Sequence, residues 1–377
     1  MATQRILDFL KTRRPEGPCV VVDLDVVREN YHGFEKALPQ SRIFYAVKAN
    51  PEPQILRLLA DLGSNFDTAS VEEIEMALDA GASPERISYG NTIKKERDIA
   101  RAYALGISLY AVDCIEEVEK IARVAPDAKV FCRVLTDGEG AEWPLSRKFG
   151  CVPTMAIDVL RRANGLGLVA YGVSFHVGSQ QTNLDAWDSA LADAAGVFEA
   201  LAKEGIKLQM VNMGGGFPTR YLKDVPTAQA YGNAIFEALS KHFGNRIPET
   251  IIEPGRGMVG NAGVIRTEVV LISKKSASDE QRWVYLDVGK FNGLAETMDE
   301  AIRYPIVTPH DGDITAPCVL AGPTCDSADV MYEKTPYPLP LSLTIGDELL
   351  ILGTGAYTTT YASIAFNGFE PIRSYVI

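Results

Sequence analysis

The chain has 377 residues, a length that favours two domains over one core. It is 46% hydrophobic and 23% charged, which is typical of a soluble globular protein. A net charge of -12 without a basic stripe argues against nucleic acid as a partner, and no apolar run is long enough to predict a membrane span. The six scattered cysteines include no Cys-x-x-Cys pair, so we expect no metal site and no disulfide framework. Because the N-terminus also lacks an apolar signal core, we expect a cytoplasmic protein.

After a short apolar strand at Cys19–Val22, placed ahead of any helical pattern, strands alternate with amphipathic helices. Ser70 is expected to begin one helix, because Glu73 follows at the spacing of a capping box. Eight strands alternating with helices predict an α/β fold with a closed (β/α)8 TIM-like barrel, and an open doubly wound sheet is the competing arrangement. The strands are expected near Tyr45, Phe66, Ser88, Tyr110, Phe131, Ser174, Val211 and Ile252. The helices are expected at Gln54–Leu62, Val71–Ala80, Lys94–Leu105, Ile115–Ala125, Thr154–Ala163, Leu184–Glu204 and Ala228–Phe243.

After Gly260 the pattern changes to strands with little helix between them. The polar segment Lys274–Gln281 is expected to be a hairpin tip, and the N-terminal strand is expected to join this region. The predicted domains are a barrel at 24–262, inserted into a discontinuous and mostly β domain made of 1–23 with 263–377. The later strands are expected at Val264–Ser273, Trp283–Val288, Cys318–Ala321 and Glu348–Leu352.

Polar residues stand where barrel strands are expected to end, which is the edge that carries function in such barrels. Lys48 closes the apolar run Ile43–Val47 and is expected to be buried. Burial would lower the pKa of its amine and make it a nucleophile for carbonyls, whereas a lysine that snorkels out of the rim would be inert. The strand alone does not decide between these interpretations. Unusual residues stand at the ends of six of the eight predicted strands. They are Lys48, Asp67, Arg133, His176, the glycine run after Met213, and Glu253.

Two glycine-rich loops follow the last two barrel strands. Backbone N–H groups without intervening side chains can surround an anion, and barrels often bind phosphate at these two loops. A tight turn that needs glycine is the alternative, and the paired arrangement with Arg256 favours the anion site. The spacing is not that of the dinucleotide-binding fingerprint. The loops are Gly214-Gly215-Gly216 and Gly255-Arg256-Gly257.

His176 and Glu253 add two further groups at strand ends. His176 is interpreted as a flat ring lying against a planar cofactor, with a hydrogen-bonded core histidine as the alternative. Glu253 needs a cationic partner, either a protonated ring nitrogen or an arginine, because unpaired buried carboxylates are costly. A reactive lysine, a phosphate cradle, a stacking ring and this carboxylate together describe a site for pyridoxal 5'-phosphate.

The motifs resemble those of the barrel-fold, pyridoxal phosphate-dependent decarboxylases of ornithine, diaminopimelate and arginine, and most of all the short bacterial ornithine/lysine type. The resemblance spans nearly the whole chain and implies an alanine-racemase-like fold (fold type III). It rests on eight segments in order: Phe44–Lys48, Phe66–Ser70, Lys148–Gly150, Phe175–Ser179, Gly214–Pro218, Glu253–Arg256, Gly322–Asp326 and Gly355–Thr358.

The resemblance also implies a role for each matching residue. Lys48 would be the Schiff-base lysine, His176 would stack on the cofactor ring, and Glu253 would bind the ring nitrogen. Cys325 would return a proton after carbon dioxide leaves. Asp67 and Arg133 would position Lys48 and the cofactor. The phosphate would be held by Ser179, Gly216, Gly255, Arg256 and Tyr357, and Gly214 and Gly215 would also bind the cofactor. The substrate would be met by Glu296, Thr297, Asp326 and Phe366.

The implied activity is the decarboxylation of L-ornithine to putrescine in polyamine biosynthesis, with L-lysine to cadaverine as a second reaction. Cys325 and Asp326 would reach into the site of a second chain, so a homodimer with shared active sites is expected. The segment Phe291–Thr297 departs from the animal enzymes, which end it on an aspartate, and Glu296 or Thr297 takes that place. The preference between ornithine and lysine therefore stays open. The alternatives are a lysine-preferring or other basic amino-acid decarboxylase, a racemase, and a non-catalytic decoy that binds a regulatory partner.

Overall fold

The computed structural model describes residues 2–136, 138–143 and 148–377. The chain divides into two compact units. The barrel unit comprises Arg28–Pro218 and Val225–Met258, and the β unit comprises Met1–Val27, Thr219–Asp224 and Val259–Ile377. Residues 24–27, 219–224 and 259–262 thus belong to the β unit, although they fall inside the predicted barrel range of 24–262.

The barrel unit is built on a closed ring of eight strands, in which every pair of neighbours is parallel. The predicted (β/α)8 barrel is therefore confirmed, and the open sheet is excluded. The strands are short apolar runs because both of their faces are covered. In ring order they are β2 (Ser41–Ala46), β3 (Asn65–Thr68), β4 (Ile87–Tyr89), β5 (Leu109–Val112), β6 (Lys129–Arg133), β8 (Val169–Ser174), β10 (Met210–Asn212) and β11 (Glu249–Ile252).

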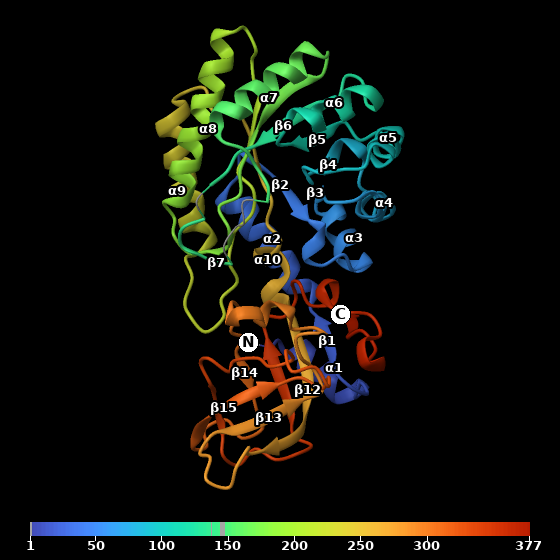
Figure 1. Ribbon diagram of the computed structural model, residues 1–377, viewed down its shortest axis with the longest axis vertical. Helices are drawn as coiled ribbons and strands as arrows, with labels where there is room; N and C mark the ends of the chain where they lie inside the picture. The colour runs from blue at the N-terminus through green and yellow to red at the C-terminus, as the bar shows by residue number, and fades with distance from the viewer. Residues whose placement is uncertain (1, 137, 144–147) are drawn as a thin grey trace. The chain divides into compact units, whose positions relative to one another are not determined.

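Helices follow the strands and lie around the outside of the ring (Figure 1). Helix α4 begins as predicted, because the Ser70 hydroxyl accepts from the N–H of Glu73 and the Glu73 carboxylate accepts from the N–H of Ala69. The helices are α2 (Leu24–Ala37), α3 (Pro53–Asp61), α4 (Val71–Asp79), α5 (Glu96–Ala104), α6 (Ile115–Val124), α7 (Pro153–Gly165), α8 (Ala186–Lys203), α9 (Ala228–Phe243) and the short α10 (Arg256–Val259). The 3-10 turns η1 (Val47–Ala49) and η2 (Pro84–Arg86), with the small β7 (Ala141–Trp143) and β9 (Ser179–Gln181) pair, complete the unit.

The β unit is a sheet in which β1 lies parallel to β18 and antiparallel to β12. The N-terminal strand therefore joins the late strands, and the antiparallel β12–β13 pair confirms the hairpin at Lys274–Gln281. The strands are β1 (Cys19–Val22), β12 (Gly263–Ser273), β13 (Arg282–Leu286), β14 (Ile306–Val307), β15 (Thr315–Ala321), β16 (Tyr337–Pro340), β17 (Glu348–Leu352) and β18 (Arg373–Val376). The turns η3 (Gly260–Ala262), η4 (Ala295–Glu300), η5 (Thr359–Tyr361) and η6 (Phe366–Gly368) connect them.

One element contradicts the sequence prediction. Helix α1 (Gln4–Arg13) precedes β1, so the first strand does not stand ahead of every helix. Thr3 caps this helix by accepting from the N–H of Ile6, and Lys11 and Arg13 lie in its last turn, where cations favour the helix dipole. Ile6 is its one fully buried residue, and Phe9 and Leu10 pack partly buried against the same cluster.

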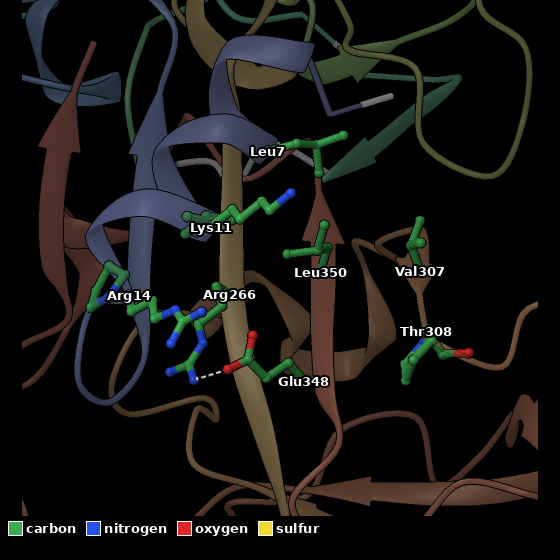
Figure 2. Close-up of a pocket in the computed structure, with 11 residues that line it drawn as sticks. Leu7, Lys11, Arg14, Arg266, Val307, Thr308, Glu348 and Leu350 are labelled. Atoms are coloured by element: carbon green, nitrogen blue, oxygen red, sulfur yellow. Dashed lines mark hydrogen bonds and ion pairs between the residues drawn. The ribbon is translucent and has the colours of Figure 1, made fainter.

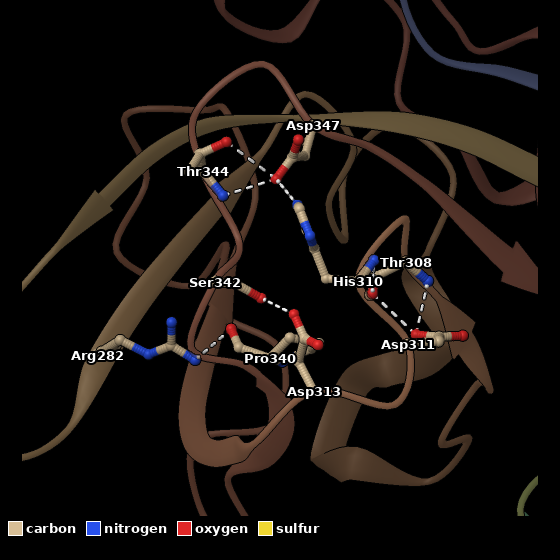
Figure 3. Close-up of polar contacts among 9 residues, drawn as sticks. All are labelled: Arg282, Thr308, His310, Asp311, Asp313, Pro340, Ser342, Thr344 and Asp347. Atoms are coloured by element: carbon tan, nitrogen blue, oxygen red, sulfur yellow. Dashed lines mark hydrogen bonds and ion pairs between the residues drawn. The ribbon is translucent and has the colours of Figure 1, made fainter.

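Loops of the β unit are held by side chains that bind backbone groups. Asp347 accepts from His310 at 3.0 Å and from the N–H and hydroxyl of Thr344, and these bonds keep the pKa of Asp347 below its usual value. Asp311 caps the neighbouring turn by accepting from both groups of Thr308. Figure 3 shows these contacts, which serve the architecture of this unit and involve none of the predicted site residues.

Candidate active site

The predicted barrel residues gather at the ends of their strands. Asp67 lies in β3 and Arg133 ends β6, whereas His176 lies two residues beyond β8 and Glu253 directly follows β11. Lys48 lies beyond β2, in the turn η1, and its side chain is exposed. The prediction of a buried strand-end lysine is therefore wrong, because the strand stops at Ala46 and the 3-10 turn directs the next residues differently.

Asp67 is the most constrained carboxyl group of this set. It is buried, and Ser88 of β4 donates to its Oδ1 at 3.1 Å. Gly90 packs directly against it, because a Cβ on Gly90 would lie 1.9 Å from Oδ1. Burial raises the pKa of Asp67 well above its usual range, the charge of Glu253 adds to the rise, and the Lys48 ammonium opposes it. These electrostatic effects place Lys48 and Glu253 near Asp67.

His176 is held as a neutral ring. The N–H of Gly178 donates to Nδ1 at 3.0 Å, so the ring hydrogen of the neutral form is on Nε2. Burial lowers the pKa of His176 well below its usual value, and the positive charges of Arg133 and Lys48 lower it further. Thr136 donates to the carbonyl of His176 at 2.7 Å and fixes its backbone. A neutral, flat ring can lie against an aromatic cofactor without adding charge.

Glu253 is oriented from the neighbouring strand. The side-chain amide of Asn212, at the end of β10, donates to Glu253 Oε1, and the Asn212 oxygen accepts from Gly214 N–H at 2.9 Å. The Glu253 N–H in turn donates to the Gly214 carbonyl at 2.8 Å. The position of one carboxylate oxygen of Glu253 is thereby fixed by residues at the ends of β10 and β11.

Arg133 completes the charged set. Burial lowers the pKa of its guanidinium, while Glu253, Asp67 and Asp113 oppose that shift by their negative charge. Its guanidinium carbon lies 5.4 Å from the centre of the Phe149 ring. Asp67 therefore interacts with Lys48, Arg133 and Glu253, and Arg133 interacts with both carboxylates, at one end of the barrel.

The glycine run after β10 is required by close packing. Gly214 and Gly216 have φ of +66° and +104°, and a Cβ on either would lie within 2.6 Å of a backbone carbonyl oxygen. A Cβ on Gly215 would lie 3.2 Å from His176 Nε2. The run therefore keeps the surface beside the histidine ring free of side chains.

Arg256 supplies a buried cation beside this run. It opens α10, is 3% exposed, and its Nη2 lies 3.2 Å from the Ser179 hydroxyl. Ser179 belongs to β9, and Gln181 of the same strand donates from its N–H to the Gly216 carbonyl at 2.9 Å. Glycine backbone, serine hydroxyl and guanidinium therefore share one corner of the barrel, which is the donor set that a phosphate needs.

These residues fit pyridoxal phosphate. The glycine cradle offers room and N–H groups, and Glu253 offers a fixed carboxylate to a ring nitrogen. The neutral ring of His176 offers a flat face, and Lys48 offers an exposed amine. None of these groups requires a metal ion, and within the described ranges no cluster of three His, Cys, Asp or Glu side chains is placed to hold one.

The substrate residues predicted in the β unit come from three distant segments, which the structure brings together. The Asn367 side chain accepts from the N–H of Cys325 at 2.9 Å, and the rings of Phe291 and Phe366 lie 5.0 Å apart. Ser363 binds the Phe291 carbonyl through both its N–H and its hydroxyl. The Cys325 loop, the 291 segment and the 366 turn therefore form one cluster within this unit.

Within this cluster the predicted residues differ in exposure. Cys325 and Asp326 are exposed, whereas Glu296 and Thr297 are buried at 5% and 1%. The Thr297 hydroxyl donates to the Leu294 carbonyl at 2.7 Å, so it is engaged in its own turn. Tyr357, also in the β unit, has a left-handed backbone with φ of +56°.

Comparisons with known proteins agree with this chemistry. Residues 24–260 match the family described as "Pyridoxal-dependent decarboxylase, pyridoxal binding domain". The chain belongs to this family. It is 35% identical to a lysine/ornithine decarboxylase of Selenomonas ruminantium, over 95% of this chain and 88% of that protein. It is also 37% identical to antizyme inhibitor 2 of Xenopus laevis, over 93% of this chain and 78% of that protein.

A solved relative has the same fold as this decarboxylase family member. The lysine/ornithine decarboxylase of Vibrio vulnificus, complexed with cadaverine, superposes with a TM-score of 0.89 at 30% identity, over the full length of both chains. The predicted fold class is thereby confirmed beyond the barrel, since the match includes the β unit. In the part of this decarboxylase that the structure describes, no helix has the length and apolarity to cross a membrane.

Four residues of this decarboxylase hold predicted site residues in place but were not predicted from the sequence. Ser88 and Gly90 confine Asp67, and Asn212 orients Glu253. Asp329, which is 2% exposed, accepts from both polar groups of Thr324 and from the N–H of Lys290, and it thereby fixes the Cys325 loop. Asn212 carried a signal, because an amide that ends an apolar strand just before a glycine run needs a partner.

A cavity of about 680 Å³ lies elsewhere in the β unit of the decarboxylase. Side chains of α1, β12 and β17 line it, among them Leu10 and Leu350, and the Arg266–Glu348 ion pair borders it (Figure 2). None of the predicted site residues lines this cavity. Its size alone does not make it the place of the chemistry.

Proposed function

We propose that the chain decarboxylates basic L-amino acids with pyridoxal phosphate, converting ornithine to putrescine and lysine to cadaverine. One observation carries the proposal. The charges of Lys48 and Glu253 act on Asp67, those of Asp67 and Glu253 act on Arg133, and those of Arg133 and Lys48 act on His176, all at a single end of the barrel. The names of similar proteins support the substrate class, because lysine/ornithine decarboxylases match over nearly the whole chain.

Pyridoxal phosphate, when bound, supplies an electron-poor ring that accepts the electrons left by departing carbon dioxide. The residues of this chain would do the rest. Lys48 holds the cofactor through its amine, and Glu253, fixed by Asn212, faces the ring nitrogen and keeps its positive charge. His176 covers one face of the ring as a neutral group. Asp67 and Arg133 position Lys48 and the cofactor.

The phosphate would bind where backbone N–H groups and a cation converge. The support is the buried guanidinium of Arg256 beside the Ser179 hydroxyl and the side-chain-free glycine run. Backbone donors hold a dianion at little entropic cost, because they are already ordered. The assigned phosphate residues are Ser179, Gly216, Gly255, Arg256 and Tyr357. Gly214, whose N–H is bound by Asn212, and Gly215 would contact the cofactor through their side-chain-free backbone.

The substrate end would be supplied by the β unit. Cys325 donates a proton to the carbon that carbon dioxide leaves, and Asp326 pairs with the distal ammonium. Glu296, Thr297 and Phe366 would line the substrate chain. Since Cys325 and Asp326 are exposed on their own unit, we propose that they act in the site of a second chain, within a homodimer.

The proposed role is the supply of polyamines, and the proposed location is the cytoplasm. All six cysteines are free thiols, which fits a reducing compartment. The second candidate function is that of a binding protein without catalytic activity. The similarity to antizyme inhibitor 2 is the reason to consider it. Retention of Lys48, Asp67, Arg133 and Glu253 favours the enzyme, because a binding protein does not need them.

The deciding experiment compares kcat/KM for ornithine, lysine, arginine and diaminopimelate with purified, cofactor-loaded protein. Ornithine and lysine are expected to exceed the other two, and one methylene is worth about 1–3 kcal/mol, so their mutual ratio should stay within about 10–200-fold. No carbon dioxide release from any of the four would favour the binding protein. Lys48→Ala serves as the inactive control.

A mixing experiment tests the shared site. Lys48→Ala and Cys325→Ala chains should each be nearly inactive alone. If Cys325 acts in the partner's site, mixed dimers contain one site with both intact residues, and partial activity should return. Absence of any recovery, with exchange of subunits verified, would contradict the homodimer proposal.

A further inference from the structure

Two buried thiols, those of Cys132 and Cys151, lie in contact next to Arg133 of the candidate site. Cys132 lies in β6 next to Arg133, and Cys151 lies 17 positions beyond Val134, with which it forms a β-bridge. Their sulfur atoms are 3.6 Å apart, and the side chains are 0% and 5% exposed. The N–H of Cys151 donates to the Arg133 carbonyl at 3.1 Å, so the backbone itself holds the two cysteines side by side.

The two thiols are chemically unequal. The two thiols share a hydrogen bond in which either sulfur can donate. This bond raises the pKa of Cys132, and burial raises it further. The same hydrogen bond lowers the pKa of Cys151, although burial and the carboxylate of Asp113 act in the opposite direction. The opposite directions favour Cys151 as the sulfur that attacks an oxidant and Cys132 as the sulfur that follows.

We propose that Cys132 and Cys151 form a dithiol site that a peroxide oxidises to an intramolecular disulfide. In the first step the Cys151 thiolate attacks a peroxide oxygen and the O–O bond breaks. This step leaves a sulfenic acid on Cys151 and a hydroxide that takes up a proton. In the second step the Cys132 sulfur attacks the Cys151 sulfur, the S–S bond forms, and the S–O bond breaks. Two thiols lose two hydrogen atoms, and one hydrogen peroxide becomes two waters.

The geometry suits this reaction. The sulfur atoms must approach from 3.6 Å to about 2 Å. The bridge between Cys151 and Val134 and the bond from Cys151 N–H to the Arg133 carbonyl keep Cys151 beside the end of β6 while the side chains rotate. In the chain as described, the other cysteines have no thiol at comparable distance, and Cys318 donates instead to the Tyr337 carbonyl at 3.1 Å. Cys132 and Cys151 are thus chemically distinct from the remaining thiols.

Formation of the Cys132–Cys151 disulfide would change the position of Arg133. This residue follows Cys132, accepts from Cys151 through its carbonyl, and carries its guanidinium over the ring of Phe149. The neighbouring Gly150 N–H is tied to Asp113 at 2.9 Å, so the segment cannot move freely away. Resting on the proposed function, we expect the disulfide to displace Arg133 and to weaken binding of pyridoxal phosphate.

The test treats the cofactor-loaded protein with hydrogen peroxide, blocks remaining thiols by alkylation, and maps peptides without reduction. The expected result is a cross-linked pair of peptides containing Cys132 and Cys151, lighter by two hydrogen atoms. Exposed Cys325 serves as the internal reference for oxidant exposure. Oxidation of Cys325 while Cys132 and Cys151 both remain thiols would overturn the proposal.

Variants sharpen this outcome. Cys132→Ser should remove the cross-link and leave Cys151 oxidised beyond the sulfenic acid, whereas Cys318→Ser should keep the cross-link. A trivalent arsenical on the unmodified chain gives a second measurement that needs no variant. It should protect both cysteines from alkylation together, and protection of neither would count against the site.

The cofactor gives a separate readout. Release of pyridoxal phosphate on oxidation, reversed by dithiothreitol, supports both the dithiol site and the placement of Arg133 at the cofactor. Formation of the disulfide without release supports the dithiol site and contradicts that placement. Failure of the dithiol proposal and failure of the proposed function are therefore distinguishable.

Discussion

Gly90→Ala should destabilise the barrel through one steric contact. The new Cβ would lie 1.9 Å from Asp67 Oδ1, and ordinary contact begins at 3.4 Å, so about 1.5 Å of movement is needed. Asp67 cannot yield easily, because it is buried and bound by Ser88. Overpacking of this kind typically costs about 1–3 kcal/mol. Since the backbone of Gly90 needs no positive φ, space alone sets the effect.

Hydrogen exchange of peptides covering β3 and β4 measures this change as a local free energy of opening. Gly196→Ala is the matched control, because it lies within α8 with nothing near its Cβ and should stabilise by about 0.5–1 kcal/mol. In an Asp67→Ala background the obstacle is gone, so Gly90→Ala should lose most of its effect. Equal destabilisation with and without the Asp67 carboxylate would refute the steric explanation.

Two further outcomes are expected for stability. Ser70→Ala removes the acceptor for Glu73 N–H at the start of α4 and should lower the free energy of unfolding by about 1 kcal/mol, measured in urea. An unchanged urea midpoint would contradict the importance of this cap. Because the folded pKa of His176 is depressed, only the unfolded chain takes up this proton as pH falls through the ordinary value of 6.5. Stability should therefore fall with decreasing pH in that region, and His176→Gln should flatten the loss; an identical pH profile in the variant would contradict it.

The strand ends could be predicted because parallel barrels bring the carboxyl ends of all strands to one edge. Asp67, Arg133 and Glu253 follow directly from that rule, and the glycine run follows from its need for positive φ. Hydrophobic periodicity sufficed for most helices, and α9 matches its predicted range of Ala228–Phe243.

Lys48 shows where local patterns fail. The apolar run before it indicated burial, but the strand ends at Ala46 and a 3-10 turn exposes the lysine. Its importance therefore does not rest on desolvation, as the sequence suggested. It rests on neighbours, since its charge acts on Asp67, Glu73 and His176.

The supporting residues could not be predicted because their partners are distant in sequence. Asn212 meets Glu253 across two strands, and Gly90 meets Asp67 across neighbouring strands. Cys132 and Cys151 meet because Cys151 forms a bridge with Val134, two residues beyond Cys132. Such pairs depend on the packed fold, whereas strand-end residues depend on order along the chain.

The most direct test of the central claim identifies the lysine that binds the cofactor. The protein is loaded with pyridoxal phosphate, reduced with borohydride and digested, and the modified peptide is sequenced by mass spectrometry. The pyridoxyl group should be found on Lys48 and should disappear in Lys48→Ala. Attachment to another lysine, such as the buried Lys94, or no attachment at all would contradict the account.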